Sequence, residues 1–76
     1  MSGEVYAKLI GSRLQAVRQD RGLTLEELEQ RSQGGFTVDV LVRWESGERM
    51  PSWPRVVQLA HFYGVPPKVL LPPESP

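Results

Sequence analysis

Apolar residues recur at three- and four-residue steps in the first part of the chain. The side chains that follow this spacing are Tyr6, Leu9, Ile10, Leu14 and Val17. Because that period matches one face of an α-helix, the pattern predicts a helix from Tyr6 to Arg21. Gly22 is expected to end it, since glycine takes up the left-handed conformation of a helix C-terminus at little cost.

A second helix is predicted over residues 24–32. Thr24 is the expected N-cap, and Glu27, three residues later, completes the pattern of a capping box. Leu25 and Leu28 supply its apolar positions. The segment Ser32–Phe36 contains two consecutive glycines and cannot continue a helix comfortably, so it is expected to form a turn.

A third helix is predicted over residues 37–46, with Thr37 as its N-cap and Gly47 at its end. Its local propensity is ambiguous, because Val38, Val40 and Val42 are β-branched and alternate as they would in a strand. No other segment reads as a strand that would pair with this one. We therefore expect a helix that is stabilised by tertiary packing.

The last regular elements are predicted to be a fourth helix capped by Ser52 and a single turn that begins at Pro67. Pro54 is tolerated in the first turn of the fourth helix, and Gly64 is expected to end it. Leu70 or Leu71 would then close the core. The predicted fold class is all-α, with four to five short helices in one domain over residues 1–71. Residues 72–76 are a Pro-rich tail or the beginning of a linker.

Composition narrows the possible functions. The 76 residues contain nine Lys+Arg, nine Asp+Glu, one His and no Cys. The chain therefore lacks the cysteines for a thiolate metal site and the several histidines of a metal triad, and no nucleophile–base pair or glycine-rich phosphate loop is evident. We expect a binding module that is not an enzyme, with no cofactor, no metal and no membrane span. The net charge of zero argues mildly against a nucleic-acid ligand.

An ordered series of short motifs points to a known family. The series comprises Gly22-Leu23-Thr24, Glu26-Glu27-Leu28, Arg43-Trp44-Glu45 followed by Gly47, Arg49 and Pro51-Ser52, then Leu59-Ala60, Tyr63-Gly64-Val65 and Leu70-Leu71. Over about residues 7–71 the chain resembles the Cro/phage-repressor (XRE-type) helix-turn-helix family. The long turn Ser32–Phe36, the Val-rich third helix and the segment Phe62–Pro66 resemble its actinomycete BldD-like subgroup.

The resemblance implies a lambda-repressor-like, sequence-specific DNA-binding domain of a bacterial transcriptional regulator. In this family the third helix lies in the major groove of double-stranded DNA. A repressor that binds palindromic sites as a homodimer is implied, and its dimer contact can lie in a region absent from this chain. Such a protein would be cytoplasmic and associated with the nucleoid.

The resemblance also implies individual roles. The residues expected to contact bases are Thr37, Val38, Asp39, Val42 and Arg43. Those expected to contact phosphates are Thr24, Arg31, Gly35, Arg49 and Ser52. Arg43 is the strongest candidate for reading a base, because a guanidinium can pair with two acceptors of guanine. Arg18 and Glu45 are expected to form a structural salt bridge between the first and third helices.

A second functional class remains open at this point. Val38, Val40 and Val42, together with the neutral net charge, would suit a groove on another protein, as in an interaction module or an antitoxin-type protein. The partner-binding extension expected of an antitoxin is not evident in these 76 residues.

Some side chains have simpler structural interpretations. Trp44 is expected in the core, Trp53 at the edge of the core and His61 on the surface. Glu26, Glu27 and Glu29 are expected to form a solvated acidic face.

Overall fold

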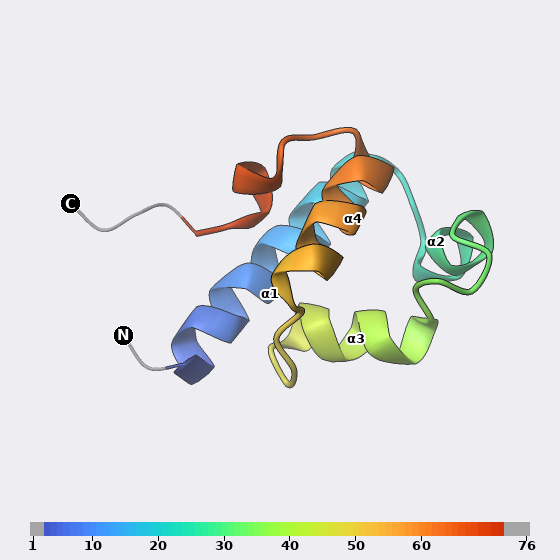
Figure 1. Ribbon diagram of the computed structural model, residues 1–76. Coiled ribbons are helices and arrows are strands. Elements are labelled where there is room, and N and C mark those ends of the chain that lie inside the picture. Colours follow the sequence, from blue (N-terminus) through green and yellow to red (C-terminus); the bar gives the residue numbers. More distant parts are fainter. Residues whose placement is uncertain (1–2, 73–76) are drawn as a thin grey trace.

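The computed structural model describes residues 3–72, so the predicted tail lies outside it except for Pro72. These residues form four α-helices and one 3-10 turn, and no strand occurs among them (Figure 1). The elements are α1 (Gly3–Asp20), α2 (Leu25–Arg31), α3 (Val38–Ser46), α4 (Trp53–Tyr63) and η1 (Pro67–Leu70). The all-α prediction is confirmed, and the Val-rich segment is helical.

Local capping explains most of the helix ends. The Thr24 hydroxyl accepts a hydrogen bond from the Glu27 amide at 3.0 Å, and the Glu27 carboxylate accepts one from the Thr24 amide at 3.1 Å, which completes the capping box. Gly47 and Gly64 end α3 and α4 in the left-handed conformation, with φ of 82° and 70°. Ser52 occupies the N-cap position of α4, but its side chain makes no capping hydrogen bond.

The first helix begins earlier than predicted. It starts at Gly3 rather than at Tyr6, because its first turn extends the helix in solvent before the apolar face begins. Ala7, Ile10 and Leu14 are buried, but Tyr6 and Leu9, which were predicted on the same apolar face, are 37% and 39% exposed.

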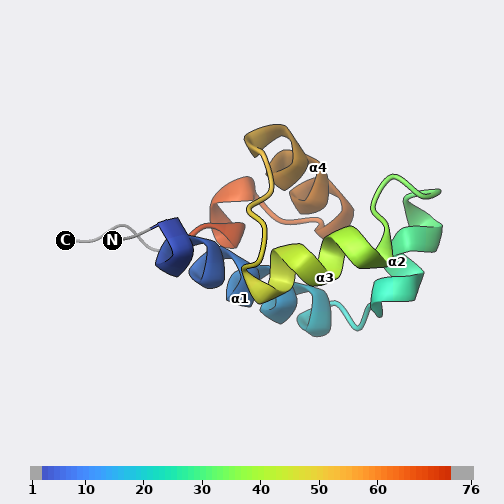
Figure 2. The same cartoon turned by 90° about the horizontal axis from the view of Figure 1, so that it is seen from below.

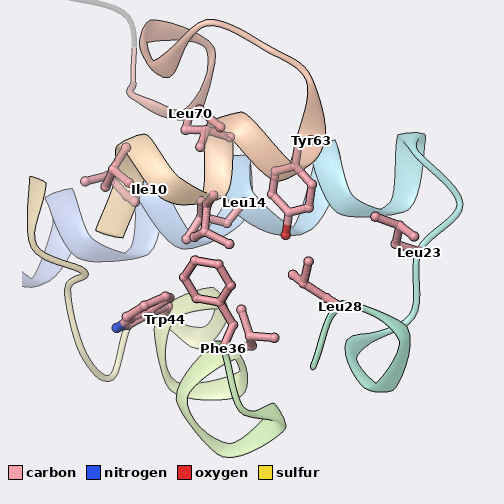
Figure 3. Packing of buried hydrophobic residues seen from close by; sticks show 12 residues of the cluster. Ile10, Leu14, Leu23, Leu28, Phe36, Trp44, Tyr63 and Leu70 are labelled. Atoms are coloured by element: carbon pink, nitrogen blue, oxygen red, sulfur yellow. The ribbon is translucent and has the colours of Figure 1, made fainter. Parts of the chain in front are cut away.

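One hydrophobic core lies between the helices (Figure 3). Every helix and η1 contribute to it, and so does the α2–α3 turn through Phe36. Trp44 is in this core as predicted, and of the two candidate leucines it is Leu70 that is fully buried. The core residues are Ile10, Leu14, Leu23, Leu28, Phe36, Leu41, Trp44, Val56, Leu59, Ala60, Tyr63 and Leu70.

The position of α3 depends on how closely α1 approaches it. α1 packs against α3 and η1, and α2 packs against α3. At the crossing point Gly11 faces the end of α3, where an added Cβ would stand 2.6 Å from the Trp44 carbonyl oxygen. No larger side chain fits at this position unless the two helices move apart.

Two predictions about side-chain environment are wrong. Trp53 does not lie at the core edge, since 57% of its surface is exposed. It is the first residue of α4, and side chains lean toward a helix N-terminus, so the indole extends beyond the helix end. Glu29 is not simply solvated either. It is half-buried, and its carboxylate lies 3.5 Å from the Val38 amide at the start of α3.

Candidate nucleic-acid interface

The third helix has one buried face and one exposed face. Leu41 and Trp44 point into the core, whereas Asp39 and Val42 lie on the opposite side. Val42 exposes 46% of its surface. Figure 1 shows α3 along the lower edge of the molecule, with the α2–α3 turn at one end and the α3–α4 connection at the other. This arrangement leaves the outer face of α3 and both its flanks accessible together.

The α2–α3 turn is held by hydrogen bonds within itself and to the end of α2. The Ser32 hydroxyl donates to the Glu29 carbonyl at 3.1 Å and accepts from the Phe36 amide at 3.0 Å. Gln33 and Gly34 both have positive φ, 53° and 80°, which allows the chain to reverse in a short distance. The turn delivers Phe36 into the core directly before the N-cap of α3.

Arg55 connects this turn to α4, and sequence reasoning missed it. Its guanidinium donates to the Gly35 carbonyl at 2.6 Å and to the Gln58 side chain at 3.0 Å. The same group lies 4.5 Å from the Phe36 ring centroid and 5.3 Å from that of Trp44. One signal was available in the sequence. A cation in the first turn of a helix opposes the helix dipole, so an arginine at this position is placed for another reason.

On the inner side of α3, Arg18 and Glu45 form an ion pair between α1 and α3. Two nitrogens of Arg18 contact the two Glu45 oxygens at 2.7 and 2.9 Å, and the third donates to the Leu23 carbonyl at 2.9 Å. The two side chains expose only 11% and 8% of their surface. Hydrogen bonding to Glu45 raises the pKa of Arg18 above its ordinary value. All nitrogens of this guanidinium are therefore engaged within the protein.

On the outer side of α3, Arg43 contacts two exposed carboxylates. Its Nε lies 3.2 Å from Asp39, one turn earlier on α3, and its Nη1 lies 3.9 Å from Glu48 in the following connection. Arg43 is 42% exposed at the side chain, so these contacts form in solvent. Solvent-exposed pairs of this kind are weak and exchange readily for other partners.

The predicted phosphate-contact residues are all exposed. Arg31 and Arg49 form no ion pair within residues 3–72. The Arg49 amide donates to the Arg43 carbonyl at 3.1 Å, which anchors the start of the α3–α4 connection to α3. Ser52 retains an uncommitted hydroxyl at the N-terminus of α4, where helix amides favour an anion.

Two of the predicted polar contact residues also act as caps. The Thr37 hydroxyl accepts from the Val40 amide at 3.3 Å, as the Thr24 hydroxyl does in its capping box. Each hydroxyl proton remains available to an acceptor, because capping uses only the oxygen lone pair. Gly35, in contrast, has no free backbone group for a phosphate: its amide donates to the Ser32 carbonyl at 2.9 Å, and its carbonyl accepts from Arg55.

The apolar surface expected on α3 is smaller than the sequence suggested. Val38 and Val40 are half-buried, and Val40 packs against the core. Val42 is the only one of the three valines that is exposed. The expectation of a three-valine docking surface is therefore wrong, because the helix turns Val40 toward the core.

Comparison with known proteins identifies the arrangement. A family model described as a helix-turn-helix domain matches residues 9–71. The chain belongs to the helix-turn-helix domain family. A curated relative is the uncharacterized HTH-type transcriptional regulator y4dJ of Sinorhizobium fredii, which is 41% identical over 58 residues, or 76% of this chain and 73% of the relative.

Two solved structures have the same helix-turn-helix fold. One is the S. venezulae BldD DNA-binding domain, with a TM-score of 0.84 and 43% identity over 88% of this chain and 97% of that one. The other is a crystal structure of the DNA-binding domain of BldD, with a TM-score of 0.87 and 44% identity over 95% and 100%. The sequence resemblance to XRE-type helix-turn-helix proteins and to BldD is therefore confirmed.

Within this helix-turn-helix domain, one buried polar atom has no hydrogen-bond partner among the described residues. It is the Tyr63 hydroxyl, which reaches into the core between Leu14 and Leu28 in Figure 3. Burial raises the pKa of Tyr63 above its ordinary value.

No helix of residues 3–72 is long and apolar enough to cross a membrane.

Proposed function

We propose that residues 1–71 form the sequence-specific DNA-binding domain of a transcription regulator, with α3 placed in the major groove. The observation that carries this proposal is the likeness to the BldD DNA-binding domain, at 43–44% identity over nearly the whole of that domain. The exposed outer face of α3 supports it, because a helix must offer side chains free of the core to contact base edges.

Arg43 has the central role in the proposed base contacts. It can leave its weak contacts with Asp39 and Glu48 and donate two hydrogen bonds to guanine. Val42 is positioned for apolar contact with a thymine methyl group. Thr37, Val38 and Asp39 lie at the N-terminal end of the same helix and complete the proposed base-contacting set.

The proposed phosphate contacts lie at both ends of α3. Arg31 flanks one end, Arg49 and Ser52 flank the other, and Thr24 caps the preceding helix. Gly35 lies in the α2–α3 turn, where its amide is already bonded to Ser32, so it would allow a phosphate to approach closely rather than donate to it. Arg49 is the most direct candidate, because its side chain makes no ion pair within residues 3–72 and it stands next to the recognition helix. The small number of such cations predicts weak, only moderately salt-dependent binding by a single copy.

A homodimer on palindromic DNA fits that weak binding. Two copies would place their α3 helices in successive major grooves, roughly 34–36 Å apart. Repression is the proposed mode of regulation, by occupation of the operator within the nucleoid. The proposal gives the chain no catalytic step, cofactor or metal.

A salt titration of duplex binding tests the proposal. Duplexes enriched from a random-sequence pool by this chain would be compared with an unrelated duplex, using Arg43→Ala and Arg49→Ala variants. Arg49→Ala should weaken binding to both duplexes and reduce the salt slope by about one, whereas Arg43→Ala should relax preference at one base position.

Arg13→Ala is the matched control. Arg13 is exposed on α1, where it lines a shallow hollow with Leu9 and Pro72, so its loss should leave base preference unchanged. Absence of measurable duplex binding at low salt, by a folded chain, would contradict the proposed function.

A further inference from the structure

The α2–α3 turn is linked to α4 by a side chain that lies 20 residues away in the sequence. The backbone and Ser32 hydrogen bonds of residues 32–36 join the turn to itself and to the end of α2, so they fix its shape and its attachment to α2 but not its distance from α4. The Gly35 carbonyl instead accepts from Arg55 on α4, at 2.6 Å. This bond is short and charge-assisted, which places it among the stronger hydrogen bonds in proteins.

The same guanidinium covers an aromatic cluster beneath the turn. Phe36 meets Trp44 and Phe62 edge to face, with ring centroids 6.0 and 5.6 Å apart. Arg55 lies over the face of Phe36 at 4.5 Å, where its charge interacts favourably with the ring. Since Phe36 belongs to the turn, Trp44 to α3 and Phe62 to α4, the cluster joins all three segments at one point.

Arg55 is itself held in one orientation. Gln58, one turn later on α4, accepts a hydrogen bond from its Nη1 at 3.0 Å. The planar guanidinium can make these two hydrogen bonds and stack on a ring simultaneously, whereas a lysine ammonium has neither the plane nor the fork of donors. These contacts therefore depend on the planar shape of the guanidinium as well as on its charge.

We propose that Arg55 is a positioning residue, which locks the Ser32–Phe36 turn to α4 and thereby sets where the first turn of α3 stands. Thr37 and Val38 follow Phe36 directly, so any movement of the turn moves the N-terminal end of α3. The consequence for base reading rests on the proposed DNA-binding function. The placement of the turn does not.

The first experiment measures the turn itself, without DNA. Amide hydrogen exchange by NMR would be compared in the wild-type chain and in Arg55→Lys, with Arg13→Lys as the control for an arginine-to-lysine exchange elsewhere. Exchange at Gly35, Phe36 and Val38 should become roughly tenfold faster in Arg55→Lys, the factor for losing one charge-assisted hydrogen bond. Amides in the middle of α1 should be unaffected. Unchanged exchange at the turn would overturn the proposal.

The second experiment separates positioning from direct contact with DNA. Arg55→Lys keeps the charge and Arg55→Met removes it. A positioning role predicts that both variants lose roughly tenfold in affinity for the preferred duplex, with unchanged affinity for an unrelated duplex and an unchanged salt slope. A phosphate contact predicts wild-type behaviour for Arg55→Lys and a slope reduced by about one for Arg55→Met, and this result would overturn the proposal.

Two controls keep these outcomes distinct. Circular dichroism shows whether each variant is folded, and if Arg55→Met is not, the conservative lysine variant decides. If the wild-type chain binds no duplex, the proposed function fails, while the exchange measurement still decides whether Arg55 places the turn.

Discussion

Both sides of α3 carry contacts between an arginine and carboxylates, but these contacts have different roles. On the inner side, Arg18 and Glu45 meet with two short contacts and almost no exposed surface. On the outer side, Arg43 meets Asp39 and Glu48 at 3.2 and 3.9 Å, and the carboxylates are 76% and 64% exposed. α3 thus has a buried ion pair on its inner side and weak, exposed ion pairs on its outer side.

Burial explains the difference. Water and salt screen the outer contacts, so each contributes at most about 0.5 kcal/mol and a phosphate or base can replace it. The inner pair is shielded from solvent, and removing one member would leave the other charged and without a partner. An arginine that is fully engaged inside the protein has a structural role, whereas one held loosely at the surface is available for a ligand.

Breaking the inner pair should have the largest effect on stability. Glu45→Ala leaves the Arg18 guanidinium buried without its carboxylate, and we expect the free energy of unfolding to fall by about 3 kcal/mol. Urea unfolding followed by circular dichroism measures it. Glu48→Ala, the same exchange at the outer pair, should cost less than about 0.5 kcal/mol. Equal losses in the two variants would contradict the comparison. The double variant Arg18→Met/Glu45→Leu should recover part of the stability, because it leaves no buried charge but removes the hydrogen bond to the Leu23 carbonyl.

The buried phenol of Tyr63 should make the stability of the protein depend on pH at high pH. Burial raises the pKa of its phenol, so the folded state keeps a proton that the unfolded state releases above about pH 10. The unfolded state then binds fewer protons, and stability falls as pH rises through this range. Tyr63→Phe removes this dependence and the unpartnered hydroxyl together. We expect it to raise the free energy of unfolding by about 1 kcal/mol at pH 7 and more at pH 11, measured by urea titrations at both values. A variant that loses stability at pH 7 would show that the hydroxyl has a favourable partner.

The smallest effect on stability is expected at the outer pair, where binding should respond instead. Glu48→Gln removes a negative charge beside Arg43, with a change in unfolding free energy below about 0.5 kcal/mol. Under the proposed function, affinity for DNA should rise roughly threefold at low salt, because one source of repulsion is lost. Fluorescence anisotropy with a labelled duplex measures this change. Asp20→Asn, at the end of α1, is the charge-matched control, and an equal gain there would assign the effect to net charge alone.

Sequence reasoning succeeded where the interacting residues are close together in the sequence. The capping box at Thr24, the cap at Thr37 and the glycines at 47 and 64 involve residues within a few positions of one another. All the residues that form each cap therefore lie within a few positions of one another, where the sequence shows them directly. The Val-rich helix was also predicted, by the argument that a strand would have no partner.

Interactions between distant segments were not accessible in this way. The contact between Arg55 and Gly35 spans 20 residues, and no local pattern shows that α4 passes beside the turn. The exposure of Trp53 and the burial of Val40 likewise depend on how each helix is rotated against its neighbours. The family motif supplied the Arg18 and Glu45 positions, which span 27 residues and which spacing alone would not have paired.

The missing side chain at Gly11 determines how far the recognition helix stands out from the protein. α1 can approach the end of α3 only because no Cβ lies between the two backbones. A larger residue would act as a spacer and push α3 outward or tilt it, although position 11 is on the side of α3 that faces away from the proposed DNA surface. Under the proposed function, the depth to which α3 enters a groove can thus be altered by a substitution on its core side, without changing any residue proposed to contact DNA.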